Sequence, residues 1–366
     1  MKAAIAKSPH SSLRVLCLQG RNFGGNPYVG LFCASLERAG VRVVDTHTSE
    51  ARLFKFDVLH LHWPDLYVTL RQFHEAIVIG VMFLFYLLVT KLLRKKIVWT
   101  VHDVRPSRVR HPRLLNLYLC CVRALVDAYV FMSPSSEAEF KEIFPRAGKR
   151  ATWHVPHGPY PVSTPSPQRQ GEMRERLSGG TNCLLVGFVG DLRPYKNAEV
   201  LAYLPHKDSN GRDVKIVVAG ARDPCDPTEI EVALSCIPVR HLVRIRERLT
   251  DHCLVDIIRA VDVVMLPYRR GSNSGFSMLV LSCGQRLLCS ALPMFEDLRN
   301  RLGSPWVYIF NHRAENLSAE LDTGLSRLQQ DTVDIDAKLR LGAFLDDCSF
   351  DHGARQLRVL YERLIT

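Results

Sequence analysis

Residues 183–203 read CLLVGFVGDLRPYKNAEVLAY, and the same kind of pattern recurs along the chain. The aliphatic run up to Val189 ends at Gly190, which is typical of a buried parallel strand. From Asn197 onward, apolar residues recur at helical spacing until Pro205. The segment therefore predicts a strand, a turn and a helix, which together form the repeating unit of a doubly wound α/β domain.

Two cations, Arg193 and Lys196, lie in the predicted turn between that strand and that helix. A helix N-terminus carries partial positive charge and free N–H groups, so two cations beside it form a site for a diphosphate. Strand-to-helix turns also carry cations that are simply solvated. The spacing alone leaves both interpretations open.

The positive charge of the chain is confined to its N-terminal half. The 366 residues carry a formal net charge of +11. Residues 1–162 contain 22 Lys and Arg and 11 Asp and Glu, whereas residues 163–366 contain 26 of each kind. A one-sided basic excess indicates an anionic partner, which could be nucleic acid, a phosphorylated substrate or an anionic lipid surface.

The cysteine pattern bears on the compartment and on metal binding. The 11 cysteines include no C-x-x-C pair, and several lie inside apolar runs. This favours reduced core thiols in a cytosolic compartment over a disulfide framework or a zinc site. The N-terminus lacks the long apolar core of a signal peptide. We expect neither a bound metal nor a cofactor other than the substrate nucleotide.

Strand and helix patterns alternate in both halves of the chain, which predicts two doubly wound, Rossmann-like α/β domains with a cleft between them. We expect one domain over residues 1–162 and a second over 163–345. The last helix, 346–366, is expected as a segment that can cross back to the first domain. The stretch 159–180 is rich in Pro, Ser and Gln and is predicted to be the interdomain linker.

The segment 76–90, AIVIGVMFLFYLLVT, contains no charged residue and is followed by four cations within residues 91–96. A membrane-spanning helix needs about 20 apolar residues, so this segment is short for a span. It suits either a buried core helix or an interfacial helix, and the adjacent cations favour an anionic membrane surface. The arginine-rich segment 105–113 would add to the same surface.

The order of these features resembles the GT-B glycosyltransferases of family 4. Within that family it is most similar to bacterial exopolysaccharide β-mannosyltransferases of the xanthan type, which act on polyprenyl-diphosphate glycolipids. The resemblance covers about residues 12 to 362 and rests on a glycine-rich first loop and five motifs. The motifs are HLHWP at 60–64, WTVHDVRP at 99–106, VPHGPYP at 155–161, GFVGDLRPYK at 187–196 and LPYRRGSNSGFSMLVLS at 266–282.

The resemblance implies a GT-B fold and an inverting transfer of a hexose, with mannose from GDP-mannose as the implied donor. The implied acceptor is an oligosaccharide linked to polyprenyl diphosphate, and the product is β-linked. Two alternatives stay open. One is another GT-B enzyme that uses a UDP-sugar, as a transferase or an epimerase, and the other is an inactive membrane-docked scaffold.

The resemblance also implies roles for individual residues. Those implied at the donor diphosphate are Arg193, Lys196, Gly190, Ser274 and Gly275. Those implied at the nucleotide and sugar are Tyr268, Asn273, Phe276 and Ser282. The implied acceptor-side residues are Gly24, Gly25, Asn26, His62 and Trp63. The sequence departs from the family at Ser274 and Ser282, because many members have glutamates there that face the sugar and the ribose.

An inverting transferase needs a base to take the proton of the acceptor hydroxyl. Asp103 follows a predicted buried strand, beside His102, at the edge of the sheet where ligands bind. Asp65, in HWPD, is the second candidate. Asp103 could instead brace a loop or cap a helix, and His102 could orient the base, bind phosphate or simply pack. Cations and helix ends, rather than a metal, would stabilise the departing diphosphate.

The expected partners are a nucleotide sugar, a polyprenyl-diphosphate glycolipid and an anionic membrane surface contacted through residues 76–96 and 105–113. Because of these partners, we expect the protein to be attached peripherally at the cytoplasmic face of the inner membrane. The arginine cluster lacks interleaved aromatic residues and the chain contains no recognisable nucleic-acid-binding module, so we do not expect nucleic acid as a partner.

Overall fold

The structure is a computed structural model that describes residues 13–21, 26–106, 109–164, 166–221 and 229–366. The chain divides into two compact units. Unit 1 comprises residues 1–157 and 348–366, and unit 2 comprises residues 158–347. The division therefore falls after His157 rather than after residue 162, and the last helix belongs to unit 1.

The sheet of unit 1 contains six parallel strands in the order β2-β1-β3-β4-β5-β6. The strands are β1 (Arg14–Cys17), β2 (Arg42–Val44), β3 (Val58–Leu61), β4 (Lys96–Val101), β5 (Ala128–Phe131) and β6 (Ala151–His154). The helices are α1 (Pro27–Arg38), α2 (Ser49–Arg52), η1 (Pro64–Tyr67), α3 (Phe73–Leu92), α4 (Pro112–Leu125), α5 (Pro134–Ile143), η2 (Ala147–Lys149) and α13 (Phe350–Ile365). The strand order reverses between β1 and β3, and ligands bind at such a switch point in open α/β sheets.

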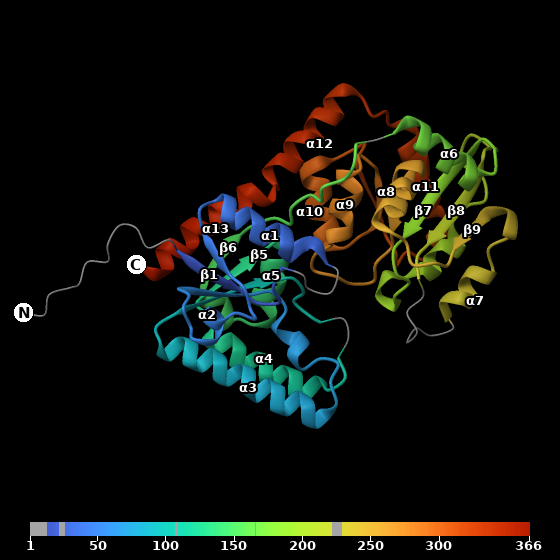
Figure 1. Ribbon diagram of the computed structural model, residues 1–366. Coiled ribbons are helices and arrows are strands. Elements are labelled where there is room, and N and C mark those ends of the chain that lie inside the picture. Colours follow the sequence, from blue (N-terminus) through green and yellow to red (C-terminus); the bar gives the residue numbers. More distant parts are fainter. Residues whose placement is uncertain (1–12, 22–25, 107–108, 165, 222–228) are drawn as a thin grey trace, which may run out of the picture. The chain divides into compact units, whose positions relative to one another are not determined.

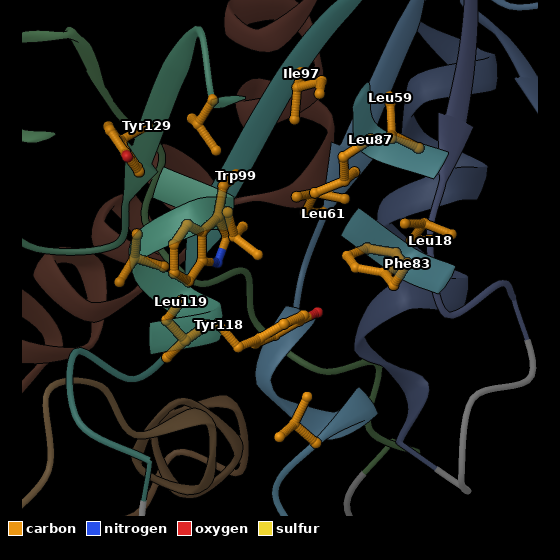
Figure 2. Close-up of a cluster of buried hydrophobic side chains, with 14 of the residues drawn as sticks. Leu18, Leu59, Leu61, Phe83, Leu87, Ile97, Trp99, Tyr118, Leu119 and Tyr129 are labelled. Atoms are coloured by element: carbon orange, nitrogen blue, oxygen red, sulfur yellow. The ribbon is translucent and has the colours of Figure 1, made fainter. Parts of the chain in front are cut away.

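Helices cover both faces of this sheet (Figure 1). On one face, α3 and α4 pack against the strands, and Figure 2 shows Phe83 and Leu87 of α3 directed into that core. On the other face lie α1 and α13, whose buried residues share a core. The contact between α13 and the loop after β6 is close, because a Cβ on Gly353 would lie 2.6 Å from Cγ1 of Val155.

The sheet of unit 2 is also six-stranded and parallel, in the order β12-β11-β10-β7-β8-β9. The strands are β7 (Cys183–Val189), β8 (Asp213–Ala219), β9 (Leu242–Ile245), β10 (Val263–Leu266), β11 (Leu287–Ser290) and β12 (Val307–Phe310). The helices are α6 (Pro167–Ser178), η3 (Pro194–Lys196), η4 (Ala198–Tyr203), α7 (Glu229–Ser235), η5 (Val239–His241), α8 (Asp251–Ala260), α9 (Gly275–Ser282), α10 (Pro293–Leu302), α11 (Leu317–Gln330) and α12 (Ile335–Asp347). Here the order reverses between β7 and β10.

The predicted linker at 159–180 is wrong over much of its length, because Pro167–Ser178 forms α6 and belongs to unit 2. The Pro and Ser that suggested a linker start this helix, since Ser166 accepts a hydrogen bond from the backbone N–H of Arg169 and Pro167 occupies the first turn. Ion pairs from Arg169 to Asp256 and from Arg174 to Asp262 then fix α6 to its neighbours.

The helix predicted from Asn197 onward is a 3₁₀ helix, η4, rather than an α-helix. Asn197 has a φ of 58°, in the left-handed region, so the chain reverses there and enters a single short helix. This places the turn 190–197 beside the carboxyl end of β7, at the switch point of unit 2.

Candidate active site

The turn after β7 is held by two close backbone approaches. Gly190 has a φ of 97°, and its N–H donates to the carbonyl of Ala219 at 2.8 Å. A Cβ on Gly220 would lie 2.4 Å from the carbonyl oxygen of Gly190, so only glycine fits at position 220. The ends of β7 and β8 are thus locked together beneath the turn that carries the two cations.

Lys196 is buried rather than solvated. Its exposed fraction is 8%, and its Nζ lies 5.7 Å above the ring of Phe276. Burial lowers the pKa of Lys196 to about 8, although Asp191 opposes this shift. No carboxylate of the described residues lies within 4.0 Å of this ammonium group. A buried cation without an ion pair is suited to an anionic ligand, so the solvated interpretation does not apply to Lys196.

Arg193 is the more accessible of the two cations. Its guanidinium lies 3.3 Å from the carboxylate of Asp191, and both side chains are partly exposed to solvent. An exposed ion pair of this kind is weak and exchanges readily for another anion. The turn after Gly190 therefore carries one partly exposed and one buried positive charge.

The loop after β10 leads into α9, which begins at Gly275. Ser274 caps this helix, because its hydroxyl oxygen accepts a hydrogen bond from the N–H of Ser277 at 3.2 Å. Asn273, Gly275 and Phe276 are half-buried around it. Residues 273–276 and the turn 190–196 thus approach one another through the contact between Lys196 and Phe276.

Tyr268 and Ser282, which the resemblance assigned to the nucleotide or the sugar, are engaged in contacts with other residues of unit 2. Tyr268 is buried, and its ring packs against Tyr195 and Phe295 at centroid distances of 5.5 and 5.6 Å. The hydroxyl of Ser282 donates to the carbonyl of Met278 at 2.7 Å and accepts from the N–H of Tyr160 at 3.1 Å. The serine at position 282 therefore fastens the chain before α6 to α9.

In unit 1, the loops after β3 and β4 bring two histidines together. Nδ1 of His62 lies 3.1 Å from Nε2 of His102, and the ring of His102 stacks on Trp63 at 4.0 Å. The edge of Tyr28, from α1, contacts the ring of His102 at 4.8 Å. Burial lowers the pKa of His62 to about 3 and also lowers the pKa of His102, so both rings are neutral near pH 7.

The two candidate bases lie in the loops that carry these histidines: Asp65 is near His62, and Asp103 follows His102. Asp65 is in η1, after β3, and burial raises its pKa to about 6. Asp103 follows β4, and its pKa is also raised to about 6. The main cause is the loss of hydration among the surrounding residues, and the charges of Asp65 and Glu139 add to it. The side chain of Asp103 is nevertheless exposed, so water offsets part of that rise. The charge of Asp65 is thus a secondary cause of the raised pKa of Asp103, and a raised carboxylate pKa suits a base near neutral pH.

Of the residues of the glycine-rich loop that the resemblance assigned to the acceptor side, the structure describes Asn26, which supports the start of α1. Asn26 caps α1, since its side chain accepts from the N–H of Tyr28 at 3.0 Å. Gly24 and Gly25 lie outside the described residues, as does Arg108 of the segment 105–113. His62 is buried, and its Nε2 has no hydrogen-bond partner among the described residues.

Sequence analysis missed the histidine at position 60 and the C-terminal tyrosine that it contacts. Nε2 of His60 lies 2.7 Å from the hydroxyl of Thr100, and Nδ1 contacts the hydroxyl of Tyr361 in α13. The rings of His60 and His62 stack at 4.8 Å. Their spacing of two residues at the end of β3 is the available sequence signal, because residues two apart in an extended chain point to the same side.

The apolar helix α3 is longer than the charge-free segment suggested, since it spans 20 residues from Phe73 to Leu92. Only 28% of its most apolar window is buried, so it is not simply a core helix. Phe83 and Leu87 pack into the core, whereas a row of large apolar side chains is exposed. That row comprises Phe73, Ile77, Val78, Val81, Met82, Phe85, Leu88 and Leu92. Among the described residues, this helix alone is long and apolar enough to cross a membrane, on length and composition only.

Among the described residues, no group of three or more His, Cys, Asp or Glu side chains is arranged to hold a metal ion. In unit 2, the ammonium group of Lys196 lies over Phe276 in the first turn of α9, and Arg193 lies in the same turn of the chain as Lys196.

No family model matches the sequence. A search of curated proteins finds a GDP-mannose:glycolipid 4-beta-D-mannosyltransferase of Xanthomonas campestris pv. campestris, which is 23% identical over 303 residues. The match covers 82% of this chain and 80% of that relative. It spans most of both chains, so it does not reflect one shared segment only.

Solved structures share the whole architecture at low sequence identity. The Anabaena protein Alr3699/HepE in complex with UDP and glucose has a TM-score of 0.66 at 15% identity, covering 96% of this chain and 100% of that one. The catalytic domain of starch synthase IV from Arabidopsis thaliana, bound to ADP and acarbose, has a TM-score of 0.67 at 12% identity, covering 97% and 100%. These likenesses and the two six-stranded parallel sheets confirm the predicted fold class.

Proposed function

We propose that the chain, which has the GT-B fold, is a glycosyltransferase that transfers mannose from GDP-mannose to a glycolipid with inversion. The acceptor is an oligosaccharide linked to polyprenyl diphosphate, and the product is a β-mannoside used in exopolysaccharide synthesis. The observation that carries the proposal is the buried, unpaired Lys196 beside Gly190, which suits a donor diphosphate. The choice of donor and acceptor is supported by the relative named as a GDP-mannose:glycolipid mannosyltransferase.

In the proposed reaction, a carboxylate of the pair Asp103 and Asp65 accepts the proton of an acceptor hydroxyl. The hydroxyl oxygen forms a bond to C1 of mannose as the bond from C1 to the phosphate oxygen breaks. GDP leaves with that electron pair. Lys196, Arg193 and the first turn of α9 stabilise the charge on the departing diphosphate, and the proposal assigns no part of this work to a metal ion.

His62 and His102 act as supports rather than as proton carriers in this scheme. Both are neutral near pH 7, and their 3.1 Å contact joins the loops that carry Asp65 and Asp103. A fixed, buried pair of rings limits the movement of both carboxylates relative to each other.

We also place the protein at the cytoplasmic face of the inner membrane, attached through α3. The exposed apolar row of α3 supplies the area to be buried, and just after its end Arg94 is an exposed cation and Lys95 a partly exposed one. Apolar burial and attraction to anionic lipids add, and together they give stable attachment of an interfacial helix. Lys91 contributes less, because it is engaged with Asp127 at 2.5 Å.

Transfer of radiolabelled mannose to a lipid extract tests the proposal directly. Label from GDP-mannose should enter the lipid phase, and UDP-glucose should give none. Stabilisation by a panel of nucleoside diphosphates identifies the base, because a ligand that binds only the folded state raises the unfolding temperature. Preference for UDP would indicate a UDP-sugar enzyme. Stabilisation by GDP without transfer or donor turnover would indicate an inactive scaffold.

A further inference from the structure

Unit 2 contains a cavity whose lining includes neither Arg193 nor Lys196. Its volume is about 690 Å³, within the range of about 300–1,000 Å³ typical of small-molecule sites. It lies between η4 and the start of α11, beyond the carboxyl ends of β10 and β12. The lining residues used below are Asn197, Glu199, Tyr203, Arg269, His312 and Arg313.

The lining of the cavity includes Asn197, the last residue of the turn 190–197, but not Lys196. Buried residues of η4 and α11 form one core with the sheet, which includes Leu201 and Leu321. Lys196 lies instead over Phe276 of α9, a helix whose buried residues are not part of that core. A ligand in the cavity therefore meets a set of side chains separate from those at Lys196.

Two arginines, Arg269 and Arg313, line the cavity together with the carboxylates of Glu199 and Glu315. Nε of Arg269 donates to Oδ1 of Asn197 at 2.7 Å, and the same guanidinium lies 3.4 Å from Glu199. Arg313 is exposed and has no ion pair among the described residues. Burial and the charges of Arg313 and Arg269 lower the pKa of His312, so both arginines are close to its ring. The first amides of α11, which lack helical acceptors, add partial positive charge.

Hydrogen-bonding atoms without partners lie in the same cavity. Oε2 of Glu199 and Nδ1 of His312 are buried, and neither has a hydrogen-bond partner among the described residues. Buried polar atoms are normally satisfied, so such atoms require an explanation. The ring of Tyr203, which is 52% exposed, offers a flat apolar surface beside them.

We propose that this cavity binds a phosphorylated hexose. Arg313 and Arg269 meet the phosphate, Glu199 and His312 hydrogen-bond to sugar hydroxyls, and Tyr203 supports the ring. A bidentate guanidinium suits phosphate, and a free carboxylate oxygen suits a hydroxyl donor. A neutral sugar would make no use of the charge of Arg313, and inorganic phosphate would make no use of Oε2 of Glu199 or of the ring of Tyr203.

Isothermal titration of the 366-residue chain with mannose 6-phosphate tests this proposal, with the donor site first saturated by GDP. Saturable binding is expected, and Arg313→Gln, Glu199→Gln and Tyr203→Ala should each weaken it by about tenfold, the scale of a charge-assisted or buried hydrogen bond. Arg176→Gln is a matched control, because Arg176 is an exposed arginine on α6. Lys196→Met should also leave this binding unchanged.

Parallel titrations with mannose 1-phosphate, methyl mannoside and inorganic phosphate distinguish the ligand classes. Tighter binding of the 1-phosphate would indicate a glycosyl phosphate, and tighter binding of the 6-phosphate would indicate a free sugar phosphate; both support the proposal. It is overturned if mannose phosphates do not bind, or if methyl mannoside or inorganic phosphate binds equally well. It is also overturned if Lys196→Met abolishes the binding, since the ligand would then occupy the donor turn.

Discussion

Nδ1 of His62 lies 3.1 Å from Nε2 of His102, and this contact joins the loops that follow two neighbouring strands. One ring must donate and the other accept, which neutral imidazoles can do and two imidazolium rings cannot. Burial keeps the pKa of both histidines low, so the contact persists throughout the neutral range. The ionising groups of these loops are therefore the carboxylates of Asp65 and Asp103.

The pH dependence of kcat/KM should be bell-shaped. The base must be ionised, so the rate should fall as the pH drops through the raised pKa of Asp103, which lies at or below about 6 because water reaches its side chain. Lys196 must be protonated to hold the diphosphate, so the rate should also fall as the pH rises through about 8. A profile that is flat across both values would contradict these assignments.

Removal of the buried cation should weaken donor binding without harming the fold. Lys196→Met and Arg193→Gln should each cost about 1.5–3 kcal/mol of nucleoside-diphosphate binding, measured by calorimetry. Burial disfavours the charge of Lys196, so the unfolding temperature of Lys196→Met should stay equal or rise. Arg176→Gln serves as the matched control. Unchanged affinity in both donor-turn variants would rule out this turn as the diphosphate site.

Asp103→Asn should lower the transfer rate by at least about 100-fold and leave donor binding intact, because the amide keeps the shape but cannot accept the proton. Asp65→Asn should retain more activity and move the acidic limb of the pH profile to lower pH, since the charge of Asp65 raises the pKa of Asp103. An active Asp103→Asn with an inactive Asp65→Asn would reverse the two roles. If both variants were active, the base would lie elsewhere.

The exposed row of α3 should control membrane attachment. Replacement of Val81, Met82 and Phe85 by Ser should release the protein from anionic vesicles in a flotation assay, because these side chains are 60–66% exposed. Its circular dichroism and unfolding temperature should change little. High salt should weaken the attachment of the wild type only partly, since apolar burial is not screened.

A contrasting variant separates attachment from folding. Phe83→Ser with Leu87→Ser should destabilise the protein by several kcal/mol, because both side chains are buried in the core beneath α3. Failure of the wild type to bind vesicles would contradict the membrane proposal. Equal binding by the wild type and the Val81, Met82 and Phe85 variant would show that α3 is not the attachment surface.

The sequence by itself determined the alternation of strands and helices, because hydrophobic periodicity is a local property that each segment carries in full. It located the turn after Val189 and the loop before Phe276, since short apolar runs that end at Gly190 or Pro267 mark the carboxyl ends of buried strands. It could not recognise α6, where Ser166 and Pro167 begin a helix as readily as they form a linker.

Only the tertiary structure decided what those positions do. Whether Lys196 is solvated or buried depends on Phe276, which lies far along the chain and reaches it through the pairing of β7 with β10. Whether Ser282 is available depends on the N–H of Tyr160, which occupies its hydroxyl oxygen. The two faces of α3 were likewise unreadable, because the helix is apolar all round and only packing against the sheet selects the buried side. Burial, ion pairing and accessibility arise from contacts between distant segments, and no local pattern encodes them.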